Sequence, residues 1–183
     1  GMISGFEFQP SLSSDTVLLR PLTQDHFAGL QRCAGDLATW ADYPTAAVRE
    51  TGDLSSWFSN GVGNAKALII LDAKTSEIMG TTRYYAVPDE PNAVGIGYTF
   101  IGSAFRNSGQ TNAVLKQMMF AHAFDAVEAV WFHVLPENMR SQAAVRKLGV
   151  TALGQQTLHL TDMHRAYECF RLEKAAWLKP QAI

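Results

Sequence analysis

The feature that most constrains the fold is an apolar strand that runs through a short polar loop directly into a long apolar helix. The strand is predicted over Val94 to Ile101, the loop over Arg106 to Thr111 and the helix over Ala113 to Phe124. The first turn of such a helix presents backbone N–H groups without partners and a partial positive charge, so it suits a pyrophosphate. Gly109 alone is weak evidence, and an ordinary polar connection remains the alternative reading.

Short apolar segments on both sides of this feature predict a mixed α/β domain. A strand and a helix begin the chain, a hairpin precedes the feature, and a strand, a helix and an antiparallel pair follow it. We therefore expect a mostly antiparallel mixed sheet of about six or seven strands with helices on its faces. The other strands are expected at 17–20, 67–71, 78–87, 129–134, 153–160 and 165–172, and the other helices after Thr23 and from Asn138 to Leu148.

Length and charge favour one cytoplasmic domain. The chain has 183 residues and a formal charge of -2, with no basic stripe for nucleic acid. Residues Met2 to Pro10 show no basic region followed by a long apolar run, and no later stretch approaches the roughly 20 apolar residues of a membrane helix, so we expect a cytoplasmic protein. We assign 1–16 to an N-terminal extension, in which Gly1 is a scar of tag removal, 17–173 to the domain, and 174–183 to a tail.

Metal binding and assembly are less constrained. The two cysteines and five histidines lack the spacing of a metal site, so no metal is expected. The tail around Trp177 can pack on the core or on a partner, which leaves a homodimer open.

Residues 36–64 combine Trp40, Tyr43, Trp57 and Phe58 with glycine and serine, which is typical of a substrate lid.

Asn138 and Ser141 have two readings. Before a helix, Asn is an N-cap residue and Ser141 is a structural residue of the first turn. On the first turn after a central strand, they would also face a ligand held between neighbouring strands. His133, near the end of the preceding strand, is the histidine best placed to act as a general base, although a structural role is the alternative.

Several motifs, taken in order, resemble one family. The chain is similar to the GCN5-related N-acetyltransferases (GNAT), and within them to the RimJ/RimL-type group that acetylates ribosomal-protein N-termini. The similarity spans roughly Val17 to Leu172. The motifs are Val17-Leu18-Leu19-Arg20-Pro21-Leu22, Gly80-Thr81-Thr82-Arg83-Tyr84, Ile96-Gly97-Tyr98-Thr99-Phe100, His122-Ala123-Phe124, Asn138-Met139-Arg140-Ser141 and Arg146-Lys147-Leu148-Gly149.

The resemblance implies that acetyl-CoA lies in a V-shaped opening between the two central strands, with its pyrophosphate at the loop amides. Two registers of the loop motif stay open: Arg106 with Gly109 and Thr111, or Gln110 with Asn112. Asn138 and Ser141 match the positions that approach the pantetheine arm and the thioester. The implied cofactor-binding residues are Phe100, Ile101, Arg106, Asn107, Ser108, Gly109, Gln110, Thr111, Asn112, Asn138 and Ser141.

Two positions depart from the family pattern of proton carriers. Where many relatives have a Glu this sequence has Gly95, and where other branches have a general-acid Tyr it has Val145. Placing a neutral amine close to the thioester can still accelerate a direct transfer, and backbone N–H groups of the irregular strand can polarise the carbonyl. The candidate catalytic residues are His133, Glu137 and Tyr84, as a water-mediated proton relay, and Ser141.

The predicted function is therefore transfer of acetyl from acetyl-CoA to a primary amine, either a protein N-terminus or a small molecule. A non-catalytic acyl-CoA-binding or regulatory module is the alternative, because both usual proton carriers are replaced. The acceptor is not identified by sequence, since acceptor pockets are built from variable loops.

Overall fold

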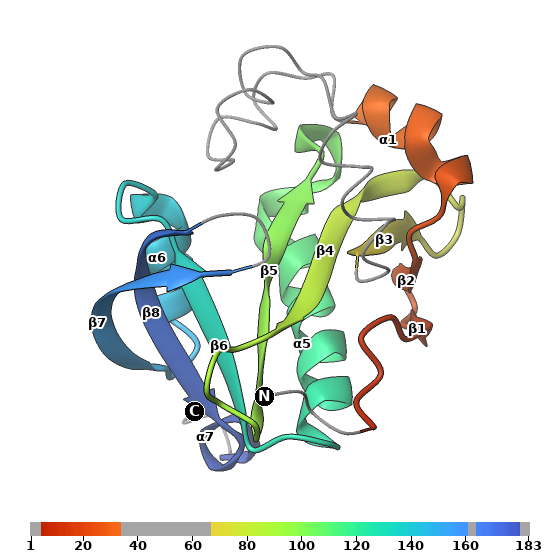
Figure 1. Ribbon diagram of the computed structural model, residues 1–183. Coiled ribbons are helices and arrows are strands. Elements are labelled where there is room, and N and C mark those ends of the chain that lie inside the picture. Colours follow the sequence, from red (N-terminus) through yellow and green to blue (C-terminus); the bar gives the residue numbers. More distant parts are fainter. Residues whose placement is uncertain (1–4, 34–66, 161–163, 180–183) are drawn as a thin grey trace. The chain divides into compact units, whose positions relative to one another are not determined.

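Eight strands lie in the hydrogen-bonded order β1-β2-β3-β4-β5-β6-β8-β7 in the computed structural model, which describes residues 5–33, 67–160 and 164–179 (Figure 1). The predicted mixed sheet with flanking helices is confirmed. The strands are β1 (Leu12–Ser13), β2 (Val17–Pro21), β3 (Ala67–Asp72), β4 (Ile78–Ala86), β5 (Ala93–Ile101), β6 (Ala129–Val134), β7 (Thr151–His159) and β8 (His164–Glu173).

The described helical segments lie between groups of one to three consecutive strands and after the last strand. The predicted lid at 36–64 lies outside the described residues. The described segments are η1 (Gln24–His26), α1 (Phe27–Cys33), η2 (Ser103–Phe105), η3 (Asn107–Gly109), α5 (Gln110–Phe124), α6 (Met139–Arg146) and α7 (Lys174–Leu178), where η marks a single 3-10 turn. None of these helices is long and apolar enough to cross a membrane.

The strand count and one helix boundary differ from the sequence-based expectation. The additional strand, β1, has only two residues and pairs antiparallel with β2, which is too short for an alternating pattern to reveal. Helix α5 begins at Gln110 rather than Ala113. The polar residues Gln110 to Asn112 form its first turn, where the N–H groups need no intrahelical partner.

The chain divides into two compact units. Unit 1 comprises Gly1–Phe6, Tyr85–Gly97 and Phe120–Ile183, and unit 2 comprises Glu7–Tyr84 and Tyr98–Met119.

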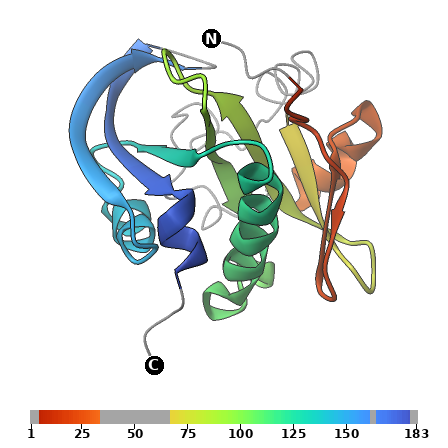
Figure 2. The same ribbon diagram turned by 90° about the horizontal axis from the view of Figure 1, so that it is seen from below.

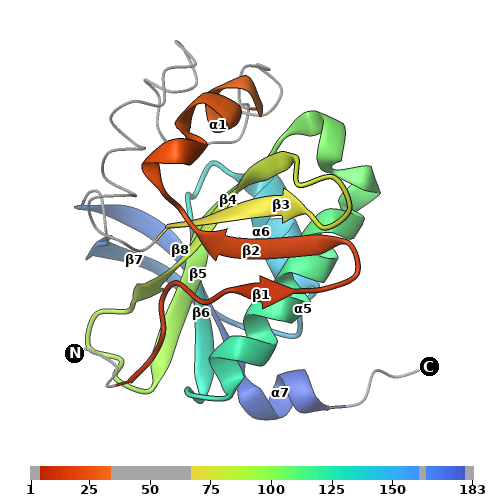
Figure 3. The same ribbon diagram turned by 90° about the vertical axis from the view of Figure 1, so that its right-hand side faces the viewer.

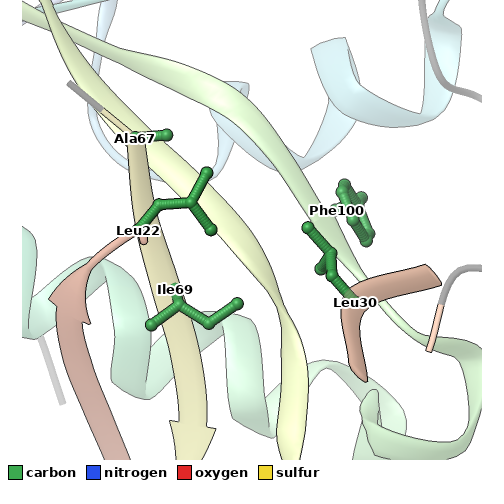
Figure 4. Close-up of a cluster of buried hydrophobic side chains, with 5 residues drawn as sticks. All are labelled: Leu22, Leu30, Ala67, Ile69 and Phe100. Atoms are coloured by element: carbon green, nitrogen blue, oxygen red, sulfur yellow. The ribbon is translucent and has the colours of Figure 1, made fainter. Parts of the chain in front are cut away.

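In unit 2, four strands run side by side (Figure 3). The β2–β3 pair is antiparallel in a register that sets Val17 opposite Asp72. Helix α1 adds Leu30 to a buried cluster drawn in Figure 4, so the helix covers the strands through an apolar contact. The members of this cluster are Leu22, Leu30, Ala67, Ile69 and Phe100.

In unit 1, β6, β8 and β7 lie side by side as antiparallel neighbours (Figure 1). Strand β5 pairs with β6 in parallel, with Ala93 opposite Ala129 and Gly95 opposite Trp131. The end of α5 packs on β6 through an edge-to-face contact of Phe120 with Phe132, whose ring centroids are 6.1 Å apart.

Helix α7 follows β8 directly (Figure 2). Its Trp177 stacks on Phe124 of α5 with ring centroids 5.2 Å apart. The sequence leaves open whether Trp177 packs on the core or on a partner, and in the structure it packs on the chain's own core.

Candidate functional site

The loop before α5 in unit 2 has a strained backbone. Asn107 has a φ of 48°, Ser108 of 53° and Gly109 of 89°. The left-handed region suits glycine, but it costs an ordinary residue on the order of 1–2 kcal/mol. Such strain persists where the surrounding structure enforces it, and it clusters at ligand-binding loops.

Hydrogen bonds hold this loop in place. The Gly109 N–H donates to the Arg106 carbonyl at 3.0 Å, and the Asn107 amide donates to the Gln110 side chain at 2.9 Å. The Thr111 hydroxyl donates backwards to the Phe105 carbonyl at 2.5 Å. The Thr111 side chain is thereby held by the preceding segment, while its backbone N–H belongs to the first turn of α5.

The segment that contains the loop carries positive charge and no negative charge. The segment from Gly102 to Phe124 contains no Asp or Glu, but it contains Arg106 and Lys116. Arg106 Nε–H donates to the Ile101 carbonyl at 3.0 Å, which anchors the guanidinium to the end of β5. Lys116 Nζ donates to the Asn112 side chain at 3.2 Å, and burial lowers the pKa of Lys116 to about 8.

Lys116 was not among the residues that sequence reasoning selected. It lies one helical turn after Asn112, and that i, i+4 spacing was the available signal. At neutral pH it adds a second cation near the first turn of α5.

Two predicted cofactor residues at the end of β5 have different environments. The Phe100 side chain is 4% exposed and belongs to the buried cluster of unit 2 (Figure 4), so only its backbone remains for a ligand. The Ile101 carbonyl accepts the Arg106 hydrogen bond.

The backbone of β5 is irregular at Tyr98, which has a φ of 53°. The Arg83 guanidinium carbon lies 4.9 Å from the Tyr98 ring centroid.

In unit 1, Asn138 caps helix α6. Its side-chain oxygen accepts the Ser141 N–H at 3.1 Å, as an N-cap residue does. A residue missed by sequence reasoning completes the turn: Gln142 is buried, and its amide donates to the carbonyls of Leu135 at 3.2 Å and Pro136 at 2.9 Å. These bonds fix the connection between β6 and α6.

His133 lies on β6 among aromatic rings. Its Nδ1 shares a hydrogen bond of 2.7 Å with the Tyr85 hydroxyl, and Trp131 stacks on its ring with centroids 5.6 Å apart. Tyr167 approaches edge-on at 6.0 Å. Burial lowers the pKa of His133 to about 4, so the imidazole is neutral at neutral pH.

The other relay candidates are placed differently. In unit 2, the Tyr84 hydroxyl donates to the Met119 carbonyl at 2.7 Å, and burial raises the pKa of Tyr84. In unit 1, Glu137 has a side chain that is 63% exposed, and it lies 3.6 Å from the Arg165 guanidinium. An exposed pair of this kind contributes little to stability.

The two positions that lack the usual proton carriers are both packed. A Cβ at Gly95 would lie 2.1 Å from the Tyr85 ring, so a side chain there has no room. Val145 is 8% exposed and packs in the core. Among the described residues, no three His, Cys, Asp or Glu side chains gather in a way that could hold a metal ion.

The fold is similar to that of solved acetyltransferases. A probable GNAT-family acetyltransferase from Chromobacterium violaceum shares 18% identity, with 97% of this chain and 95% of that chain covered and a TM-score of 0.75. RimJ from Mycobacterium smegmatis, in complex with CoA-disulfide, shares 18% identity over 94% of this chain and 90% of that one, with a TM-score of 0.65.

RimL, a ribosomal alpha-N-protein acetyltransferase in complex with coenzyme A, shares 17% identity over 93% of this chain and 99% of that one, with a TM-score of 0.65. A comparison with curated protein sequences gives no match. The model of the acetyltransferase (GNAT) domain matches residues 16–151, so the chain belongs to the GNAT acetyltransferase family. The predicted family, with RimJ and RimL among the similar structures, is confirmed.

Proposed function

We propose that this protein transfers acetyl from acetyl-CoA to a primary amine, either a protein N-terminus or a small molecule. The observation that carries the proposal is the strained loop from Asn107 to Gly109 immediately before α5. Family membership supports acyl transfer, and the RimJ and RimL structures contain CoA.

The loop fits the pyrophosphate of the donor. Its left-handed residues are followed by the first turn of a helix, and that turn attracts anions through its N–H groups and the helix dipole. Arg106 and Lys116 add positive charge, and no acid between Gly102 and Phe124 opposes them. The left-handed Gly109 supports the register in which Arg106 and Gly109 are the motif residues and Thr111 replaces a small residue.

The remaining candidates would bind and orient the reactants. Asn138 and Ser141, at the start of α6, would approach the pantetheine arm, and Ser141 would lie near the thioester. An attacking amine must be neutral and must lose a proton as the amide forms. His133, Glu137 and Tyr84 are the candidate carriers of that proton. His133 alone of these offers a ring nitrogen, and burial keeps its imidazole neutral at neutral pH.

A second candidate is a non-catalytic acyl-CoA-binding module. One observation favours it: Tyr85 fills the space above Gly95, and Val145 packs in the core, so neither position supplies a titratable side chain. This candidate predicts binding of acetyl-CoA without transfer.

Calorimetric titration with acetyl-CoA, followed by an assay of free thiol release, separates the two candidates. The acceptors are a panel of small primary amines and peptides with free N-termini. Binding with turnover on one acceptor supports the enzyme. Binding without turnover on any acceptor supports the module, and no binding overturns both.

A further inference from the structure

Tyr85 of unit 1 reaches across a neighbouring strand. Strand β5 lies between β4 and β6 in the sheet, and Tyr85 on β4 contacts His133 on β6. The ring crosses β5 above two glycines: a Cβ would lie 2.1 Å from the ring at Gly95 and 3.2 Å from it at Gly97. The two glycines therefore leave the space that Tyr85 needs to reach His133.

Aromatic rings confine the imidazole on several sides. Trp131 is nearly parallel to His133, at an interplanar angle of 12°, and Tyr167 is close to perpendicular, at 78°. Tyr85 and Tyr167 are 1% and 6% exposed. The imidazole therefore has little freedom to turn, and the Tyr85 hydroxyl selects which ring nitrogen faces it.

The other ring nitrogen is unsatisfied. Nε2 of His133 is buried, and within the described parts of the chain it has no hydrogen-bond partner; the same holds for Nε1 of the stacked Trp131. A buried polar atom without a partner costs about 1–3 kcal/mol, so two of them on stacked rings require an explanation. A bound polar group, such as an amine or a water molecule, would satisfy them.

We infer that Tyr85 is a positioning residue for acetyl transfer, which holds His133 with its proton on Nδ1 so that the bare Nε2 accepts the proton of the acceptor amine. This inference rests on the proposed function. The proton between Nδ1 and the Tyr85 oxygen can lie on either atom, and only its position on Nδ1 leaves a lone pair on Nε2.

The proton balance of the step is simple. The amine nitrogen bonds to the acyl carbon while the carbon–sulfur bond breaks, and the sulfur leaves as a thiolate with that electron pair. The amine proton passes to Nε2, directly or through one water, and the imidazolium donates through Nδ1 to the Tyr85 oxygen. The proton then leaves Nε2 for solvent, and the neutral imidazole is restored.

The groups packed around His133 favour a neutral resting ring. Tyr85 comes from β4, Tyr167 and Cys169 come from β8, and Cys169 is the register partner of His133. Burial raises the pKa of Cys169 to about 11, so its thiol is neutral as well. Two charged residues of β8 lie near this group: Glu168 is the register partner of Val134, and the Arg171 guanidinium carbon lies 5.8 Å from the Trp131 ring centroid. Arg171 is paired with Glu90 at 3.4 Å.

Nitrogen NMR of the histidine side chains at neutral pH measures the tautomer directly, without turnover. In the wild type we expect the His133 proton on Nδ1. In Tyr85→Phe, which keeps the ring above Gly95 but loses the hydroxyl, we expect it to move to Nε2. A wild-type proton on Nε2, or the same tautomer in both proteins, overturns the inference.

Kinetics supply the second readout. We expect Tyr85→Phe to lower kcat about tenfold or more, leave the KM for acetyl-CoA in place and move the acidic limb of the pH profile to lower pH, because the imidazolium loses its acceptor. The matched control Tyr167→Phe removes a hydroxyl from another ring against His133, and we expect both the tautomer and the pH profile to stay in place.

Failure of the proposed function and failure of the inference about Tyr85 give different results. Wild-type protein that binds acetyl-CoA but turns over no amine overturns the proposed function, while NMR separately decides whether Tyr85 orients His133. An active wild type with an unchanged pH profile in Tyr85→Phe leaves the function standing and overturns the inference.

Discussion

The hydroxyl of Tyr84 donates a hydrogen bond of 2.7 Å to the backbone carbonyl of Met119 and so ties β4 to α5 within unit 2. Tyr84→Phe would remove this hydrogen bond, while the Met119 carbonyl would keep its backbone N–H partner inside α5. We expect the free energy of unfolding to fall by about 0.5–1.5 kcal/mol, measured by urea denaturation. A shifted pH profile of transfer with unchanged stability would instead support the relay role that the sequence predicts.

A side chain at Gly95 should be poorly tolerated. In Gly95→Ala the new Cβ would lie 2.1 Å from the Tyr85 ring, so the ring must move. We expect a loss of about 2–3 kcal/mol in the free energy of unfolding. The matched control is Gly97→Ala, where the distance is 3.2 Å, and its cost should be clearly smaller. Equal costs at the two positions would contradict this packing.

The loop glycine offers a test of donor binding. Gly109 and Gly149 both have positive φ, 89° and 83°, with nothing within 4 Å of a new Cβ. Ala at either site should lower stability by about 1 kcal/mol or more, because only backbone strain is added. Calorimetry should show weaker acetyl-CoA binding for Gly109→Ala alone. Unchanged affinity in Gly109→Ala would count against the loop as the pyrophosphate site.

Stability should depend on pH through His133. Its pKa is about 4 in the folded protein against 6.5 for the unfolded chain, so below 6.5 the unfolded state binds the proton first. The stability that the neutral His133 contributes to the free energy of unfolding is fully present above pH 6.5. It is lost as the pH falls towards 4, and the loss amounts to at most about 3 kcal/mol.

Denaturation curves at several pH values measure this dependence. His133→Gln should flatten the fall in stability between pH 6.5 and 4, whereas His159→Gln, at an exposed site on β7, should follow the wild type. Identical pH dependence in all three proteins would remove His133 as the cause.

The local parts of the fold were predictable because they depend on neighbouring residues. The strand, loop and helix around Gly109 and the cap at Asn138 follow from spacing and side-chain chemistry. The start of α5 was placed three residues late, because Gln110 to Asn112 look like a loop when judged by polarity alone.

The contact of Tyr85 with His133 was not predictable in the same way. It depends on the register of three strands, and residues 48 positions apart in sequence meet only after the sheet has formed. Gly95 and Gly97 leave space above β5, but their spacing in the sequence does not identify the residue that fills it. Likewise, the left-handed residue of β5 is Tyr98, and no local rule favours a tyrosine there.

The ring of Tyr85 above Gly95 also limits how this protein can evolve. A lineage that introduced an acidic residue at position 95 would first have to lose the tyrosine at position 85, since both side chains cannot occupy the same space. The two positions should therefore change together among descendants of this sequence. Glycine at position 95 and a large aromatic residue at position 85 should therefore be inherited together.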